Sequence, residues 1–281
     1  MLEGQALVLG GGGVAGIAWT TGLLAGLAEG GQDVTGADLL IGTSAGAAVA
    51  AQLGSGLSLD ELFARQTEPS LQAKEIPAEL DLEDFAAAFG TALEGVTSVD
   101  EMRRRVGAFA LAADTVPEAD RRAAVATRLP SPEWPERRMI LVAVDARTGE
   151  PRLFDKTSGV ALIDAVAASC AVPGIWPPVT IGGERYVDGG VRSPHNLDYA
   201  AGAAEIVVIA PMGVDAPFPA DKPLDVLADE LRAGGAKVTL VVPDEASVAA
   251  IGPNPLDPGT RLPAAEAGRA QGRGLTLGDA P

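Results

Sequence analysis

A serine flanked by glycines lies early in the chain, where it is positioned to act as a nucleophile. The segment Gly42-Thr43-Ser44-Ala45-Gly46 matches G-x-S-x-G, the pattern of a sharp strand-to-helix turn that exposes a serine hydroxyl. Gly42 and Gly46 flank Ser44 because such a turn leaves no room for side chains beside it. The small residues 47–51 predict a helix directly after the turn, and the N–H groups at a helix start favour negative charge. The segment therefore predicts acyl-transfer chemistry at Ser44.

An earlier glycine run has the form of an anion-binding loop. Gly11-Gly12-Gly13-Val14-Ala15-Gly16 satisfies G-x-G-x-x-G between a predicted strand and a predicted helix, the pattern of a dinucleotide-binding turn. A dinucleotide site also requires an acidic residue at the end of the second strand, which here runs into Gly42-Thr43-Ser44. The Gly-Lys-Ser/Thr of a phosphate loop does not follow the run either. A non-catalytic dinucleotide-binding protein is therefore kept as the alternative hypothesis.

The two glycine segments together predict an oxyanion hole. Both follow neighbouring strands, so their backbone N–H groups are expected to surround the serine hydroxyl. The expected donors are Ala45, the residue after the nucleophile, and the glycines Gly11, Gly12 and Gly13. The anion that the loop binds is then a transient tetrahedral oxyanion rather than a permanent phosphate.

The nucleophile needs a base, and the sequence offers two arrangements. Residues 179–187 predict a hairpin that delivers Asp188 at its end, followed by Gly189-Gly190. A carboxylate beside two glycines can approach another loop closely, as a direct Ser44–Asp188 dyad requires. The single histidine, His195, would complete a Ser44–Asp188–His195 triad instead. We favour the dyad and keep the triad as its alternative.

Composition limits the classes of protein that these motifs fit. With 281 residues, of which 47% are hydrophobic, the chain predicts a single globular domain over residues 1–281. One cysteine and one histidine make no Cys/His cluster, so no zinc site is expected. The formal charge of −17 argues against nucleic acid as a partner. The sequence contains no Sec-type signal and no apolar run of about 20 residues, which predicts a cytoplasmic location without a transmembrane segment.

Short apolar segments alternate with helical segments along much of the chain. This alternation predicts an α/β fold with a mainly parallel sheet between helices. Strands are expected over residues 6–9, 39–41, 139–144, 206–209 and 238–242. A helix over residues 14–29 is expected to turn Ile17, Leu23, Leu24 and Leu27 inward.

Two regions depart from this alternation. Residues 57–137 are predicted as a helical insertion, in which Ser58 with Glu61 and Ser98 with Glu101 have capping-box spacing. Residues 243–281 form a Pro/Gly-rich C-terminal segment with one short helix near residues 264–271.

Three motifs, in this order, resemble those of the patatin-like phospholipases: Gly11-Gly12-Gly13-x-x-Gly16, Gly42-x-Ser44-x-Gly46 and Asp188-Gly189-Gly190. The similarity runs from the first strand to beyond Asn196 and includes the stretch 169–174. The resemblance implies a three-layer α/β/α sandwich that hydrolyses acyl esters of lipids through an acyl-enzyme. It assigns Ser44 as nucleophile, Asp188 as base, and Gly11, Gly12, Gly13 and Ala45 as oxyanion donors, without a metal or cofactor.

The resemblance also bears on the partners of the chain. It implies a lipid or acyl-ester substrate and transient contact with a membrane or micelle surface, and it implies no oligomeric state. Family members often carry Arg or Lys shortly before the last glycine of the first motif, where this chain has Val14 and Ala15. No positive charge is therefore expected beside the loop. Neutral lipids, lysolipids and simple acyl esters all fit this expectation.

Overall fold

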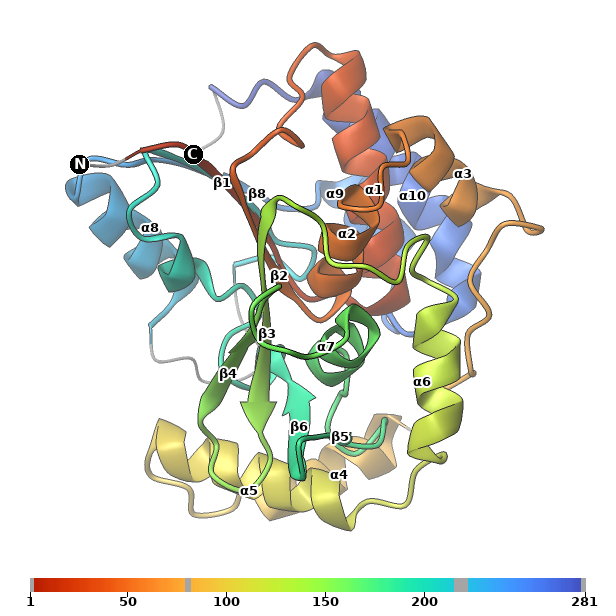
Figure 1. The fold of residues 1–281 in the computed structure, drawn as a ribbon, viewed down its shortest axis with the longest axis vertical. Helices are drawn as coiled ribbons and strands as arrows, with labels where there is room; N and C mark the ends of the chain where they lie inside the picture. Colours follow the sequence, from red (N-terminus) through yellow and green to blue (C-terminus); the bar gives the residue numbers. More distant parts are fainter. Residues whose placement is uncertain (1–2, 79–81, 215–221, 279–281) are drawn as a thin grey trace.

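A mixed β-sheet runs through the centre of the computed structural model, which describes residues 3–78, 82–214 and 222–278. Within these ranges the strand order is β5-β6-β3-β2-β1-β7-β8, and β4 pairs with β3 off this path (Figure 1). The strands are β1 (Gln5–Leu9), β2 (Leu39–Thr43), β3 (Arg138–Asp145), β4 (Pro151–Phe154), β5 (Val179–Ile181), β6 (Glu184–Asp188), β7 (Glu205–Ile209) and β8 (Lys237–Val241).

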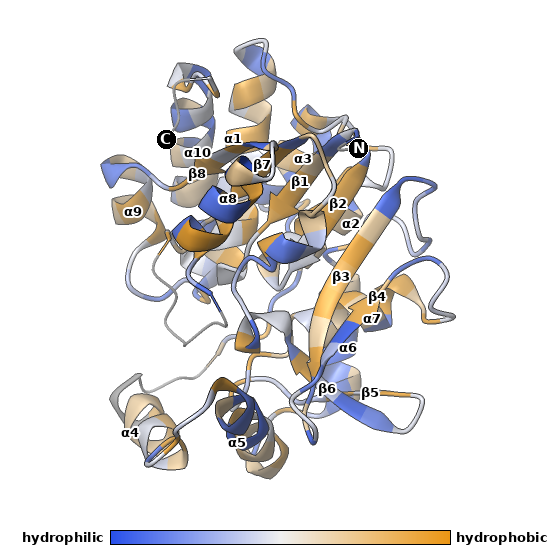
Figure 2. Cartoon of the chain, turned by 90° about the vertical axis from the view of Figure 1, so that its left-hand side faces the viewer, coloured by the Kyte–Doolittle hydropathy of each residue, from blue (hydrophilic) through white to orange (hydrophobic). Residues whose placement is uncertain are grey.

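The five strands from β3 to β8 along this order are mutually parallel, and β4, β5 and β6 are antiparallel to their neighbours. In the central strand β1, Leu7 and Leu9 belong to one buried apolar cluster, whereas Ala6 and Val8 belong to the cluster on the opposite face. This alternation follows from the two-residue period of a strand. Because both faces of the parallel strands are covered, their residues are apolar almost throughout (Figure 2).

Helices cover both faces of the sheet, so the predicted three-layer α/β/α arrangement is confirmed. One face is covered by α1 (Gly13–Glu29), α2 (Ala45–Leu53) and α7 (Leu162–Ser169). The opposite face is covered by α8 (Leu224–Ala233) and the 3-10 turn η2 (Leu197–Ala200). Within the described ranges, no helix has both the length and the apolar character needed to cross a bilayer.

Helix α1 differs from the expected amphipathic helix because every residue from Val14 to Leu27 is buried. Its outer side is covered by α10 (Arg261–Gly274), which lies alongside it (Figure 1). Glycines make this close contact possible. A Cβ on Gly22 would lie 2.0 Å from the carbonyl oxygen of Ala265, and a Cβ on Gly268 would lie 2.2 Å from that of Trp19.

The C-terminal segment, residues 243–281, is more helical than its Pro/Gly-rich composition suggests. It contains α9 (Glu245–Ile251), which begins where Asp244 accepts a hydrogen bond from the Ser247 N–H, and the 14-residue α10. The short helix expected near residues 264–271 is the centre of α10. Its glycines allow helix–helix packing rather than ending the helix.

Between α2 and β3 the described residues form four helices: α3 (Leu59–Thr67), α4 (Leu82–Ala92), α5 (Val99–Ala112) and α6 (Glu118–Ala126). Ser58 and Glu61 form the predicted capping box at α3, and Ser98 accepts a hydrogen bond from the Glu101 N–H at α5. Helices α4 and α5 lie together beyond the β5–β6 hairpin (Figure 1). There the rings of Phe85 and Phe89 stack, and Phe109 packs edge-to-face against both.

Candidate active site

Ser44 occupies a strained turn between β2 and α2. Its backbone angles are φ 55 and ψ −117, a conformation that a residue with a side chain adopts only when its surroundings enforce it. Gly42 and Gly46 leave the space that the turn needs. A Cβ on Gly46 would lie 1.9 Å from the Leu9 carbonyl oxygen at the end of β1, and a Cβ on Gly42 would lie 2.7 Å from the Cα of Ala47. The local geometry is that of a nucleophile elbow.

Buried polar side chains form hydrogen bonds to the backbone of this turn. The Ser44 N–H donates to Ser169 Oγ at 3.0 Å, and the Ser169 hydroxyl donates to the Val142 carbonyl at 2.6 Å. The Cys170 thiol donates to the Ser44 carbonyl at 3.1 Å. Burial raises the pKa of Cys170 to about 11, so the thiol is neutral at pH 7 and is not a competing nucleophile.

Asp188 ends β6 and is buried beside this turn. Its Oδ1 accepts the Gly190 N–H at 2.7 Å, whereas Oδ2 has no hydrogen-bond partner among the described residues. Burial raises the pKa of Asp188 to about 6, although the nearby Ser44 hydroxyl and the hydrogen bond from the Gly190 N–H oppose the rise. Gly189 allows the close approach to β3, because a Cβ there would lie 2.3 Å from the Val142 carbonyl oxygen. Oδ2 is thus a buried acceptor that no donor of the described residues satisfies.

The first glycine loop provides free N–H groups, though not at every expected position. The Gly11 N–H donates to the Pro194 carbonyl at 2.9 Å, so this predicted oxyanion donor is already engaged. The N–H groups of Gly12, Gly13 and Ala45 have no acceptor in the part of the chain that the structure describes. Gly13 has φ 64, and a Cβ there would lie 2.6 Å from the Pro255 carbonyl oxygen. This position therefore requires glycine.

His195 is not hydrogen-bonded to the serine or to the aspartate among the described residues. It is buried, and its ring packs against the end of β1, where a Cβ on Gly10 would lie 2.9 Å from the His195 Cδ2. Burial lowers the pKa of His195 to about 4, so the ring is neutral at pH 7. Among the described residues it makes no hydrogen bond to Ser44 or Asp188, and its Nε2 has no partner. The structure therefore does not bring the three residues of the alternative triad together.

A family model described as Patatin-like phospholipase matches residues 7–201, a range that holds all three glycine motifs. The chain belongs to this family. No curated protein matches the chain.

Two solved structures are similar to this chain. VipD from Legionella pneumophila is 14% identical with a TM-score of 0.44, over 96% of this chain and 66% of VipD. The type III effector protein ExoU is 16% identical with a TM-score of 0.38, over 97% of this chain and 52% of ExoU. The chain thus spans about two thirds and about half of the lengths of these two proteins.

Asn196 joins the segments that carry the serine and the aspartate, a role that its sequence position does not reveal. This buried residue has φ 53, and its Nδ2 donates to Thr43 Oγ1 at 3.0 Å and to the Ser193 carbonyl at 2.8 Å. Nδ2 also lies 3.3 Å from the Gly189 carbonyl. One side chain therefore ties the end of β2 to the loop after Asp188.

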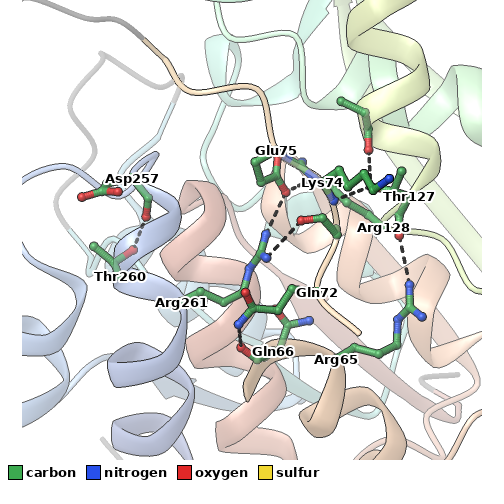
Figure 3. Close-up of polar contacts among 12 residues, drawn as sticks. Arg65, Gln66, Gln72, Lys74, Glu75, Thr127, Arg128, Asp257, Thr260 and Arg261 are labelled. Carbon is green, nitrogen blue, oxygen red and sulfur yellow. Dashed lines mark hydrogen bonds and ion pairs between the residues drawn. The ribbon is translucent and has the colours of Figure 1, made fainter. Parts of the chain in front are cut away.

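Two cavities, one apolar and one of mixed lining, border Ser44. The larger, of about 180 Å³, is bordered by Ser44 and Asp188 and lined mainly by apolar groups that include Val172, Met212 and Leu256. The smaller, of about 20 Å³, is bordered by Ser44 and Ala45 and by three charged side chains, Arg121, Arg128 and Glu75. Arg128 donates two hydrogen bonds to Glu75 (Figure 3). The arginines come from α6 and the residues after it. Their presence contradicts the expectation that no positive charge lies near the loop. That expectation considered only the residues next to the motif in the sequence, and these arginines come from a distant segment.

Proposed function

We propose that this chain is a serine hydrolase of lipid acyl esters that works through a Ser44–Asp188 dyad. Membership of the patatin-like phospholipase family supports lipid hydrolysis as the class of activity. The finer assignment rests on one observation: the strained Ser44 and the buried Asp188 border the same apolar cavity. A cavity of this kind fits an acyl chain, with its carbonyl at the serine. Met212 borders the cavity and is 43% exposed, which suits entry of a chain from a lipid surface.

In the first half of the reaction, Asp188 takes the proton of the Ser44 hydroxyl as the oxygen attacks the ester carbonyl. A pKa of about 6 makes Asp188 a stronger base than an ordinary aspartate and leaves it ionised at pH 7. Asp188 then gives the proton to the leaving alkoxide, so the alcohol departs and an acyl-Ser44 ester remains. In the second half, the same carboxylate takes a proton from the water that attacks the acyl-enzyme, and it gives that proton to Ser44 Oγ as the fatty acid is released.

The negative charge on the carbonyl oxygen needs donors in both halves. We assign this role to the N–H groups of Gly12, Gly13 and Ala45, which have no acceptor among the described residues. Gly13 and Ala45 are also the first residues of α1 and α2, where the helix dipoles favour negative charge. Loss of one such donor typically slows turnover by about a hundredfold or more. Gly11, whose N–H is bound by Pro194, is assigned to the shape of the loop instead.

A dinucleotide-binding role has less support. The strand next to the glycine loop, β2, ends in the serine turn rather than in an acidic residue that would bind a ribose. The donors that would hold a pyrophosphate instead border the cavities that contain Ser44.

The test is hydrolysis of mono-octanoyl glycerol by the wild type, Ser44→Ala, Asp188→Asn and His195→Asn, with folding followed by circular dichroism. Asp145→Asn is the matched control for Asp188→Asn, because Asp145 also ends a strand but borders neither cavity. Ser44→Ala and Asp188→Asn are expected to lose about a thousandfold or more in kcat. His195→Asn and Asp145→Asn are expected to stay within a few fold of wild type. Activity that survives Ser44→Ala would refute the proposal, and an equal loss in His195→Asn would restore the triad.

A further inference from the structure

The sheet alone does not bring the serine and the aspartate together. Ser44 follows β2 and Asp188 ends β6, and β3 lies between these two strands. Neighbouring strands are about 4.8 Å apart, so β2 and β6 are separated by roughly 10 Å, whereas direct proton transfer needs a distance of about 2.6–3.2 Å. The two strand ends must therefore converge across β3, and contacts outside the sheet must hold them there.

The loop between Asp188 and Asn196 supplies contacts of this kind. It begins in the third glycine motif, and it also contacts the first, because the Pro194 carbonyl accepts the Gly11 N–H at 2.9 Å. It reaches the second motif through Asn196, whose Nδ2 donates at 3.0 Å to Oγ1 of Thr43, the residue before the nucleophile. The loop thus links the three segments from which the candidate site is built.

Asn196 makes the contacts that cross β3. Its side chain is fully buried, and its backbone angles of φ 53 and ψ 41 are left-handed, a conformation that asparagine adopts more readily than most residues. Besides Thr43 Oγ1, Nδ2 has the Ser193 carbonyl at 2.8 Å and the Gly189 carbonyl at 3.3 Å. The two N–H bonds of one amide are therefore shared among the residue before the nucleophile, the residue after the aspartate and the loop itself.

Arg192 determines which way the amide of Asn196 points. Arg192 Nη1 donates to Asn196 Oδ1 at 2.7 Å, and the same guanidinium group donates to the two Asp198 oxygens at 2.9 and 2.6 Å. A guanidinium group has donors only, so Oδ1 must face it. The opposite orientation would place Oδ1 against two carbonyl oxygens and the NH₂ group against a cation. The NH₂ group is therefore held toward Thr43 and Gly189.

We propose that Asn196 is a positioning residue for the reaction, one that holds the Ser44 hydroxyl within reach of Asp188. Arg192 acts through Asn196, because it fixes the direction of the amide. This inference rests on the proposed function. Asn196 borders neither cavity at the serine, so it does not touch the substrate. Its loss is expected to slow the chemical step and to leave substrate binding nearly unchanged.

Thr43→Val tests this contact with the least disturbance. Valine keeps the shape of threonine and removes the hydroxyl, while Asn196 Nδ2 keeps two carbonyl acceptors. Thr43→Ser is the conservative variant, because it retains the hydroxyl. Thr21→Val is the matched control: the buried Thr21 hydroxyl donates to a carbonyl within α1 and borders neither cavity. Asn196→Gly removes the whole amide, and glycine adopts φ 53 without strain.

With mono-octanoyl glycerol, Thr43→Val and Asn196→Gly are expected to lower kcat by about ten- to a hundredfold and to leave KM within about threefold. Thr43→Ser and Thr21→Val should stay within a few fold of the wild type. The double variant Thr43→Val/Asn196→Gly should lose little more than Asn196→Gly, because both changes remove the same bond. A wild-type kcat in Thr43→Val, or a rise in KM in place of the fall in kcat, would overturn the proposal.

The pH profile separates positioning from a loss of stability. Burial raises the pKa of Asp188, and the nearby Ser44 hydroxyl opposes the rise. The Gly190 N–H also faces the carboxylate, and the Cys170 thiol near it is neutral; the variants alter neither group. If the Ser44 hydroxyl moves away, the pKa of Asp188 rises further, so the acid limb of kcat/KM in Thr43→Val should shift to higher pH. An acid limb that stays in place would indicate a purely structural role and refute the proposal.

Failure of the proposed function gives a different result, because the wild type then shows no hydrolysis that depends on Ser44 and Asp188. The position of the hydroxyl is in that case judged from the Asp188 carboxyl group itself, by carbon-13 NMR titration. Asp188→Asn identifies the signal by its absence. A higher pKa of Asp188 in Thr43→Val than in the wild type and Thr21→Val supports the positioning role of Asn196. Equal pKa values in the three proteins refute it.

Discussion

Replacement of Asp188 by asparagine is expected to remove activity. It is also expected to increase the stability of the variant relative to that of the wild type as the pH rises. The pKa of Asp188 is raised from its ordinary value of 3.8 to about 6, chiefly by burial. Between these two pH values the folded protein holds a proton that the unfolded chain has released. The wild type therefore loses stability as the pH rises from about 3.8 to about 6, and the loss is complete above that range. Asparagine does not titrate and escapes this loss.

The size of the effect follows from the shift. One pKa unit corresponds to about 1.4 kcal/mol, so a shift from 3.8 to about 6 amounts to about 3 kcal/mol in full. About 2 kcal/mol of this falls between pH 4.5 and pH 7.5, because part of the titration is already complete at the lower value. The absolute stability of the variant also depends on how well an amide NH₂ group fits the place of Oδ2, which lacks a hydrogen-bond partner among the described residues. The fit of the amide group does not change with pH, so it does not affect how the stability difference between the variant and the wild type varies with pH.

The assay is denaturant unfolding of the wild type and Asp188→Asn at matched pH values from 4.5 to 7.5. The free energy of unfolding of the variant minus that of the wild type should increase by about 2 kcal/mol over this range. Asp145→Asn again serves as the control. A difference that stays constant with pH, or one that falls, would refute the claim that Asp188 is buried with a raised pKa.

Two further predictions concern the base and the turn. With the neutral ester, kcat/KM should fall about tenfold per pH unit below about pH 6 as Asp188 is protonated, and a flat profile down to pH 5 would contradict its role as base. Gly46→Ala should destabilise the protein by about 3 kcal/mol or more because its Cβ would meet the Leu9 carbonyl. Gly90→Ala, at an exposed helical site with open space, should be neutral or stabilising by up to about 1 kcal/mol, so equal thermal melting of the two variants would argue against the elbow geometry.

The elements around the serine were predictable because glycines occur where the backbone of the turn leaves no space for a side chain. A side chain at Gly46 is incompatible with the turn, so the pattern in the sequence and the φ of 55 at Ser44 have the same cause. The β5–β6 hairpin was predictable for a similar reason, because Gly182 and Gly183 both have positive φ between two alternating strands. The dyad and the oxyanion donors remain predictions.

Contacts between distant segments were not predictable in this way. The full length of α10 was not predicted, because no local signal reveals that its glycines face the backbone of α1. Gly11, Gly12 and Gly13 are consecutive glycines that the sequence does not distinguish. Only the Gly11 N–H donates to the carbonyl of Pro194, which follows 183 residues later. Arg121 and Arg261 occur in helices rich in charged residues and carry no pattern that distinguishes them from solvent-exposed arginines. Their burial depends on tertiary packing around Glu75.

The position of the positive charge has a consequence for the base. An arginine in direct contact with Asp188 would lower the pKa of the carboxyl group and weaken it as a base. In this chain the pKa of Asp188 is set by burial and by hydrogen bonds from Ser44 and Gly190, and no arginine contributes to it. Val14 and Ala15 keep the glycine loop uncharged, while Arg121 and Arg128 reach Ser44 through the smaller cavity, which Asp188 does not border. The separation leaves Asp188 basic enough to take the serine proton, although two buried arginines line a cavity at the same serine.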